Sequence, residues 1–182
     1  ELLKDYESYA RKHAIPRTLP SYDAMLADPT IDAIYNPLPN SAHAEWTIKA
    51  LRAGKHVLCE KPLACNADEA AAMAAVARET GRVMMEAFHW RHHPLADQMR
   101  RIIQTGELGA LRHVEATMCV PLPLPNNIRY QYALGGGATM DTGCYAINIV
   151  RFLSGAEPVV RSAEARLWGD QIDRWMTADL EF

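Results

Sequence analysis

The sequence has no apolar run long enough to cross a membrane, since its longest runs, such as 70–77, fall far short of the roughly 20 residues that a spanning helix needs. It also lacks a strong excess of one charge. The 19 basic and 22 acidic residues leave a formal charge of −3, which argues against a broad basic face for nucleic acid. Cysteine is scarce, and Cys59, Cys65, Cys119 and Cys144 lack metal-type spacing, which favours reduced thiols in a cytoplasmic protein.

The glycine-rich motif of a dinucleotide site is absent as well. The pattern G-x-G-x-x-G belongs between the first strand and the first helix of such a site. Gly135 and Gly137 begin the pattern, but Met140 stands at its last position. The residues by themselves therefore do not indicate nucleotide binding. What the chain does have is apolar surface, because 49% of its 182 residues are hydrophobic, and this supports a folded core and excludes disorder.

The first half of the chain alternates strand and helix signals. Asn66 and Glu69 form a capping-box pattern before an alanine-rich helix, and Gly81 stands at the end of that helix. After helices near 2–13 and 21–27, we expect strands near 31–35, 55–59 and 82–88, with helices near 42–53 and 67–80 between them. This order predicts a parallel sheet with its ligands beyond the carboxyl ends of the strands, at 36–43, 60–66 and 89–94.

The second half of the chain changes to neighbouring strands. The pattern predicts helices near 95–104 and 138–153, a proline-rich loop at 121–125, and strands near 110–120, 159–168 and 175–182. Strands that follow one another directly favour an antiparallel sheet. We therefore predict an α/β chain in which residues 1–88 form a parallel unit and residues 89–182 form an α+β unit.

Two pairs of residues are candidates for acid–base chemistry. Glu60 and Lys61 follow the second expected strand, and a lysine partly desolvated in a crevice loses its proton more readily. The alternative is a surface ion pair at the end of a strand. Asp141 and Tyr145 are four residues apart and share one helix face, where they can bind or deprotonate a hydroxyl group. The alternative for them is a helix cap and a core tyrosine.

Two further segments are weaker candidates. A proline-rich loop after the first strand carries Asn40 and His43, which either line a pocket or, for His43, cap a helix or lie on its surface. A histidine-rich segment follows the third strand, where His89 and Trp90 can form a flat wall for a ring and Arg91 can contact an anion. We expect no metal there, because no carboxylate or cysteine has a recognised ligand spacing to these histidines. A domain hinge with packed aromatic residues is the alternative.

Taken in order, these segments resemble the Gfo/Idh/MocA family of NAD(P)-dependent oxidoreductases. The likeness rests on Tyr-Asn-Pro-Leu-Pro-Asn-Ser-Ala-His at 35–43, Ala-Gly-Lys-His-Val-Leu-Cys-Glu-Lys-Pro at 53–62, Glu-Ala-Phe-His-Trp-Arg at 86–91 and Gly-Gly-Gly-Ala-Thr-Met-Asp-Thr-Gly-Cys-Tyr at 135–145. Tyr145 lies four residues after Asp141. A tyrosine at this position makes the sequence similar to the branch that contains dimeric dihydrodiol dehydrogenase, D-xylose dehydrogenase and glucose–fructose oxidoreductase.

The resemblance implies a partial Rossmann domain, without its first βαβ turn, followed by part of an α/β domain with a mostly antiparallel sheet. It also implies NAD or NADP as cofactor, and a sugar, polyol or cyclic diol as the substrate that exchanges hydride at a CH–OH group. Lys61, Tyr145 and Asp141 match the catalytic positions. The positions matched to cofactor binding are Leu38, Asn40, His43, Glu60, Lys61, Arg91 and Arg129. We place the substrate beside His89, Trp90, Asp141 and Tyr145, with 121–125 and Tyr130 as further walls.

The resemblance also carries an electrostatic expectation and two alternatives. Lys61 and a charged nicotinamide should lower the pKa of the Tyr145 phenol, whereas Asp141 should oppose that shift. The alternative functions are a catalytically silent dinucleotide sensor or scaffold on the same fold, and a non-catalytic module that interacts through its sheet. The presence of Lys61, Asp141 and Tyr145 together argues against a silent relative.

Self-association is expected, because family members commonly dimerise through the open face of the second domain's sheet. We expect a homodimer or higher, with Trp168 and Trp175 at that surface; in a monomer they would be core residues. The chain starts at Glu1 rather than Met, and 177–182 alternate like a strand cut short. We therefore expect an internal part of an enzyme of roughly 300 or more residues, above the usual size of one domain.

Overall fold

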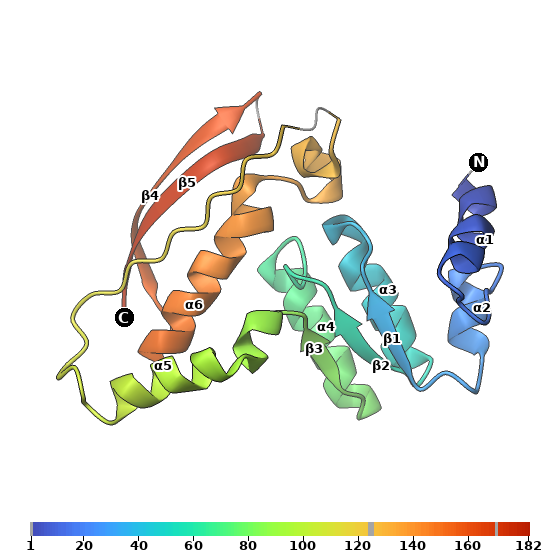
Figure 1. Cartoon of the computed structure of the whole chain (residues 1–182), viewed down its shortest axis with the longest axis horizontal. Coiled ribbons are helices and arrows are strands. Elements are labelled where there is room, and N and C mark those ends of the chain that lie inside the picture. The colour runs from blue at the N-terminus through green and yellow to red at the C-terminus, as the bar shows by residue number, and fades with distance from the viewer. Residues whose placement is uncertain (1, 124–125, 170) are drawn as a thin grey trace.

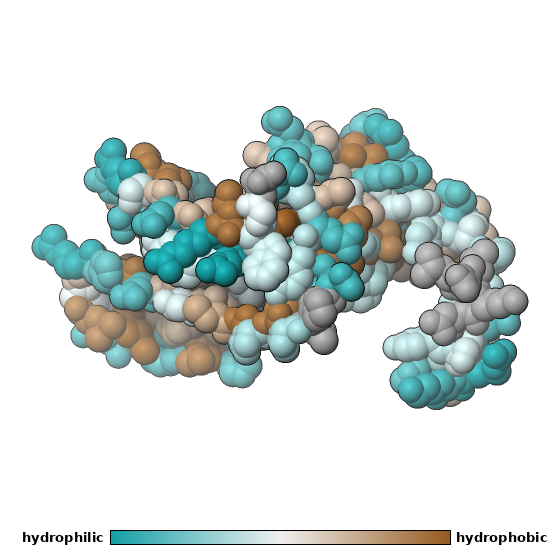
Figure 2. All heavy atoms as spheres, turned by 90° about the horizontal axis from the view of Figure 1, so that it is seen from above, coloured by the Kyte–Doolittle hydropathy of each residue, from teal (hydrophilic) through white to brown (hydrophobic). Residues whose placement is uncertain are grey.

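The computed structural model describes residues 2–123, 126–169 and 171–182. Figure 1 shows a parallel sheet with its helices on one side of the molecule and an antiparallel pair of strands with long helices on the other. The helices α1 (Leu2–Lys12) and α2 (Tyr22–Ala27) form an arm at one end, which also stands apart in Figure 2. Ser21 caps α2 as expected, because its hydroxyl accepts a hydrogen bond from the Ala24 amide at 3.0 Å.

The parallel unit has the expected βαβαβ order. It consists of β1 (Ala33–Asn36), α3 (Asn40–Arg52), β2 (His56–Cys59), α4 (Ala67–Thr80) and β3 (Met84–Glu86). The strand order is β1-β2-β3, and both pairings are parallel. All three strands therefore end at the same edge of the sheet, where residues 37–39, 60–66 and 87–93 follow. The prediction of a parallel sheet is confirmed, and α3 begins two residues earlier than expected.

The core of this unit lies between one face of the sheet and the two helices. Ile34, Val57 and Cys59 from the strands are buried against Leu51 of α3 and Met73 of α4. The other face of the sheet carries the exposed side chains of Tyr35, Leu58 and Met85. Alternation of buried and exposed residues along β1 and β2 is the period expected of strands covered on one face.

The caps of α4 confirm one expectation and correct another. Asn66 accepts a hydrogen bond from the Glu69 amide at 2.9 Å, and Gly81 ends the helix with a left-handed φ of 64°. The Glu69 carboxylate, however, accepts from the amide of Cys65 at 2.9 Å and not from that of Asn66. In the expected capping box, the Glu69 side chain would bind the amide of the N-cap residue Asn66, but it binds the amide of the residue before it. Glu69 therefore fixes the end of the loop that begins at Glu60.

The second unit contains two long helices and one antiparallel pair. Its elements are η1 (His89–His92), α5 (Pro94–Gln104), η2 (Ile128–Tyr130), η3 (Tyr132–Leu134), η4 (Thr139–Gly143), α6 (Cys144–Ser154), β4 (Val159–Trp168) and β5 (Ile172–Glu181). The expected helix near 138–153 is present, but its first turn, η4, is a π-helix. A π-turn widens the helix and re-aims the side chains in it, and Asp141 is one of those residues.

The strand expected at 110–120 does not form. Figure 1 shows this segment as an extended trace, and no described residue pairs with it in a ladder. An alternating sequence favours an extended backbone, but a strand also needs a neighbour for its amides and carbonyls. The strands near 159–168 and 175–182 are confirmed as β4 and β5, the latter shifted to begin at Ile172. All residues of β4 are exposed to solvent.

No helix in the described ranges combines the length and apolarity needed to cross a membrane. All four cysteines are free thiols. Residues 124 and 125, which belong to the proline-rich loop expected to line the substrate pocket, lie outside the described residues.

Candidate functional site

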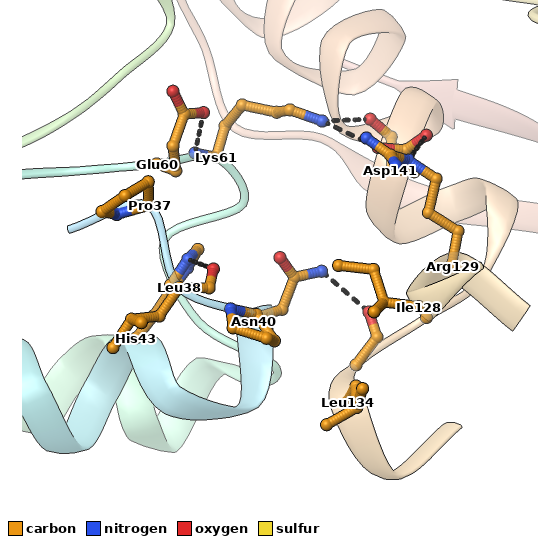
Figure 3. Close-up of a pocket in the computed structure, with 13 residues that line it drawn as sticks. Pro37, Leu38, Asn40, His43, Glu60, Lys61, Ile128, Arg129, Leu134 and Asp141 are labelled. Atoms are coloured by element: carbon orange, nitrogen blue, oxygen red, sulfur yellow. Dashed lines mark hydrogen bonds and ion pairs between the residues drawn. The ribbon is translucent and has the colours of Figure 1, made fainter. Parts of the chain in front are cut away.

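The loops after β1 and β2 meet η4 and the turn after η3 around one cavity. Figure 3 shows Lys61 reaching from the β2 loop toward Asp141, while Asn40 at the start of α3 donates to the carbonyl of Gly135, just after η3. The cavity has a volume of about 190 Å³. It is lined by Pro37, Leu38, Pro39, Asn40, His43, Glu60, Lys61, Ile128, Arg129, Leu134, Gly135, Gly136 and Asp141.

Lys61 and Asp141 are joined across the two units of the fold. The Lys61 Nζ donates to the Asp141 Oδ1 at 3.1 Å and to the Asp141 main-chain carbonyl at 2.5 Å. Arg129 Nε lies 2.7 Å from the other carboxylate oxygen of Asp141. The Lys61 side chain is 14% exposed and that of Asp141 is 24% exposed. One carboxylate is thus shared by two cations, and Glu60 lines the same cavity, so two cations and two carboxylates face a ligand there.

Tyr145 stands next to this ion pair but does not line the cavity. The Lys61 Nζ lies 5.0 Å from the centre of the Tyr145 ring, and Phe88 packs on that ring edge-on with centroids 5.4 Å apart. Burial raises the pKa of Tyr145, and the negative charges of Cys144, Glu60 and Asp141 add to the rise. The expected lowering by Lys61 is not seen, because the Lys61 ammonium is paired with Asp141, whose charge offsets it.

His43 is fully buried, so it is neither a helix cap nor a surface residue. Its Nδ1 lies 2.8 Å from the Pro62 carbonyl and its Nε2 lies 2.7 Å from the Leu38 carbonyl. The ring therefore ties the loop after β1 to the loop that carries Lys61. Because both partners are carbonyl oxygens, a doubly protonated ring donates to both, whereas a neutral ring donates to one.

Two further side-chain hydrogen bonds fix residues that line the cavity. The Tyr35 hydroxyl donates to Glu60 at 2.6 Å, and the Asn40 amide donates to the Gly135 carbonyl at 2.8 Å. A side chain at Gly135 would be impossible without movement, because its Cβ would lie 2.6 Å from the sulfur of Cys65 and 2.7 Å from the Cβ of Asn40. The glycine therefore allows the two units to approach each other at this point.

His89, Trp90 and Arg91 also lie outside the cavity, as Tyr145 does. The His89 ring is 6.3 Å from that of Tyr145, and Trp90 packs edge-on against Phe152 with centroids 5.0 Å apart. Arg91 lies over the Phe152 ring, 5.5 Å from its centre, in a second hollow on α5 and α6. The structure thus brings together Leu38, Asn40, His43, Glu60, Lys61, Arg129 and Asp141, with Tyr145 adjacent.

Two carboxylates position the site that were not among the predicted site residues. Glu86 accepts a hydrogen bond from the Leu63 amide at 2.8 Å, two residues beyond Lys61. Asp173 in β5 accepts from both the amide and the hydroxyl of Thr139 at 2.7 Å and so caps the turn that carries Asp141. Glu86 was the one acidic residue at the end of the third expected strand, which is a usable signal, whereas nothing local links Asp173 to Thr139.

The side chains around the cavity suit an organic ligand better than a metal. Within the described ranges, no cluster of three or more histidine, cysteine, aspartate or glutamate residues could hold a metal ion. The walls combine apolar Pro37, Leu38 and Ile128 with the amide of Asn40 and the ammonium of Lys61. Such a mixture of apolar walls and a few polar groups is typical of sites for small organic ligands and cofactors. The volume suits one ring and its substituent, and not a whole dinucleotide.

Comparisons with known proteins agree on one family. A profile described as "Oxidoreductase family, NAD-binding Rossmann fold" matches residues 3–88, and one described as "GFO/IDH/MocA C-terminal domain" matches residues 96–182. The D-xylose 1-dehydrogenase (NADP(+)) 2 of Haloferax volcanii is 40% identical over 169 residues, which cover 92% of this chain and 52% of that protein. The trans-1,2-dihydrobenzene-1,2-diol dehydrogenase of Xenopus tropicalis is 31% identical over 182 residues, 99% of this chain and 54% of that protein.

Solved structures give the same result. The crystal structure of KijD10, a 3-ketoreductase from Actinomadura kijaniata in complex with NADP and TDP-benzene, superposes with a TM-score of 0.90 at 36% identity, over 98% of this chain and 55% of that one. The chain spans about half the length of the relatives it matches. Two consecutive family profiles, these relatives and the shared architecture together show that the chain belongs to the Gfo/Idh/MocA family of oxidoreductases.

Proposed function

We propose that the protein carrying this chain is an NAD(P)-dependent oxidoreductase that moves hydride between a nicotinamide and a CH–OH group of a sugar, polyol or cyclic diol. The observation that carries the proposal is the meeting of Lys61 with Asp141 and Tyr145 beside one cavity. Relatives named as a xylose dehydrogenase, a dihydrobenzenediol dehydrogenase and a reductase of a dTDP-linked keto sugar support the substrate class.

Each residue has a distinct task in this proposal. Leu38, Asn40 and Glu60 hold the nicotinamide end of the cofactor, which supplies or accepts the hydride when bound. Lys61 lines the cavity and has direct access to a substrate hydroxyl, so its Nζ holds or delivers the hydroxyl proton. Asp141 fixes Nζ at 3.1 Å. The substrate oxygen would replace the Asp141 main-chain carbonyl as a partner of Nζ.

Tyr145 is the second proton carrier of the proposal. Its ring lies against the same ammonium, and the raised pKa keeps its phenol protonated at neutral pH. Reduction of a carbonyl places one proton on the substrate oxygen, and either Lys61 or Tyr145 would donate it. His89 and Trp90 are proposed as the substrate side of the site, since the His89 ring adjoins that of Tyr145. Arg129 is proposed to contact cofactor or substrate through the edge of its guanidinium that Asp141 leaves free. For Arg91 we propose no cofactor contact, since it does not line this cavity.

The test uses the full-length protein and follows NAD(P)H absorbance with a panel of aldoses, inositols and dihydrodiols. We expect Lys61→Ala and Tyr145→Phe each to lower kcat/KM by at least about a hundredfold, as is usual for general acid–base groups. Lys49→Ala and Tyr132→Phe are the matched controls, because both side chains lie on the surface away from the cavity. Near-normal turnover in either site variant would contradict the assignment.

The same assay separates the alternative of a silent sensor or scaffold. Binding of NAD(P)H to the wild-type protein is measured by quenching of the protein's fluorescence. The alternative is favoured if NAD(P)H binds and yet no member of the panel is turned over. It is rejected if one substrate gives steady turnover that depends on Lys61.

We also propose that the protein self-associates through the sheet of the second unit. This proposal is supported by β4, which is exposed along its whole length, and by Trp168, which is 61% exposed.

We further propose a boundary between the two units near residue 89, where the parallel sheet gives way to η1 and α5. The four free thiols support a proposed cytoplasmic location.

A further inference from the structure

A second hollow lies between α5 and the end of α6. It has a volume of about 280 Å³ and shares no lining residue with the Lys61 cavity within the described part of the chain. Its walls are formed by Arg91, Arg100, Asn148, Arg151, Phe152, Gly155, Ala156 and Glu157. Three guanidinium groups from three different elements, η1, α5 and α6, therefore converge on one concave surface.

Two of these arginines have no carboxylate partner among the described residues. Arg151 is paired with Glu157, through contacts of 2.8 Å and 2.5 Å. Arg100 and Arg91 instead lie over the ring of Phe152, at 4.1 Å and 5.5 Å from its centre. Stacking on an aromatic ring occupies the flat face of a guanidinium and leaves its N–H edge free for a ligand. The ring thus holds two donor edges in place over the hollow.

The local charges leave this hollow positive. The carboxylates near it are Glu157, which is paired, and Glu86, whose buried carboxyl is influenced by the charges of Arg151 and Arg91. Three guanidinium groups therefore face two carboxylates.

We propose that this hollow is a binding site for a phosphate group, either inorganic phosphate or a small phosphate monoester. Phosphate carries up to two negative charges at neutral pH and offers several acceptor oxygens, which match the paired donors of a guanidinium. The Arg100 and Arg91 edges bind the oxygens. This hollow shares no lining residue with the Lys61 cavity within the described part of the chain, and the inference does not depend on the proposed activity.

The test measures binding of inorganic phosphate and of glycerol phosphate to the full-length protein by calorimetry. Ionic strength is held constant with sodium chloride, and saturating NADP occupies the cofactor's own phosphate contacts. We expect saturable binding to the wild type and a dissociation constant at least about tenfold higher in Arg100→Gln, because a charged hydrogen bond of this kind is worth about that factor. Arg101→Gln is the matched control, since Arg101 is on the same helix, is paired with Glu107 and does not line the hollow.

The outcomes are separable. Binding that is weakened in Arg100→Gln and unchanged in Arg101→Gln supports the site, and the stronger of the two ligands identifies its source. Equal binding to both variants, or heat changes that sodium chloride reproduces, overturns it. If Arg100→Gln loses its circular dichroism spectrum, Arg100→Lys takes its place, because it keeps the charge but lacks the planar pair of donors. Wild-type affinity in that variant also overturns the proposal.

Discussion

At the scale of single residues, Glu86 anchors the loop that carries Lys61, through the Leu63 amide. Replacing it by alanine leaves the partly buried Leu63 amide without its acceptor, which costs about 1–3 kcal/mol in the free energy of unfolding. We expect Glu86→Ala to lower kcat in the full-length protein more than it raises KM, because the Lys61 loop loses its anchor. Glu86→Gln retains an acceptor oxygen and should recover most of the activity. Glu79→Ala, an exposed change on α4, is the control; equal losses in Glu86→Gln and Glu86→Ala would contradict this role.

The pKa of Glu86 adds a pH dependence to the same comparison. Burial raises this pKa above its usual 4.5, against the lowering effect of the Leu63 amide and nearby arginines. The folded state therefore binds the Glu86 proton more tightly than the unfolded state does, and this binding stabilises the folded protein at low pH. The stabilisation is lost as the pH rises through the folded pKa. Glu86→Gln carries no such proton, so its free energy of unfolding in urea melts, relative to that of the wild type, should increase as the pH rises above 4.5.

The cysteines are predicted to differ sharply in reactivity. Burial raises the pKa of Cys59 and of Cys144 to about 11, so very little reactive thiolate is present near pH 8. Cys119 is exposed. We expect iodoacetamide at pH 8 to label Cys119 well before the other two, as read by peptide mass spectrometry. Labelling of Cys59 or Cys144 at the same rate as Cys119 in the folded protein would be inconsistent with this arrangement.

At the scale of elements, the turn after η3 decides how closely the two units approach. Gly135 has a left-handed φ of 74°, and its missing side chain leaves room for Cys65 and Asn40. Gly155, after α6, has a similar φ of 71° but no atom within 4 Å of its would-be Cβ. We expect Gly155→Ala to cost about 1–2 kcal/mol from the backbone alone. Gly135→Ala should cost about 1–3 kcal/mol more from overpacking.

The functional consequence of the two glycine variants should differ too. Gly135→Ala displaces the carbonyl that Asn40 binds, so it should weaken NAD(P)H binding, measured by fluorescence titration. Gly155→Ala should leave that binding unchanged. An equal loss of stability in Gly135→Ala and Gly155→Ala, measured by thermal melts, would contradict the expected overpacking at Gly135.

The element scale also shows where local patterns suffice. Asn66, Gly81 and Ser21 mark the limits of helices through bonds within a few residues, and all three act as expected. The π-turn at Thr139–Gly143 could not be predicted, because Asp173 of β5 holds it from outside. The segment 110–120 has a strand pattern but no partner among the described residues, and a pattern cannot supply a partner.

At the scale of the whole molecule, the exposed sheet is the surface most suited to a second copy. Trp175 is 37% exposed, and the guanidinium of Arg166 lies 5.0 Å from the centre of its ring. Aromatic residues and arginine are the groups that contribute most at protein interfaces. We expect the full-length protein to elute as a dimer in size-exclusion chromatography with light scattering, and Trp175→Ala to shift it toward monomer. Tyr9→Ala, on the exposed side of α1, should leave the mass unchanged; a wild-type monomer would rule out this surface as an interface.

The sequence by itself determined the βαβαβ order, most helix limits and, through family-like motifs, the identity of Lys61, Asp141 and Tyr145 as candidates. The order and the helix limits follow from periodicity and caps, which act over a few residues, whereas the three candidates follow from the family resemblance. Only the tertiary structure decided that Arg129 shares Asp141 with Lys61, that His43 is a buried tie between two loops, and that Arg91 faces a different hollow. The reason is physical: these contacts join residues far apart in the chain, and their geometry depends on how the two units pack.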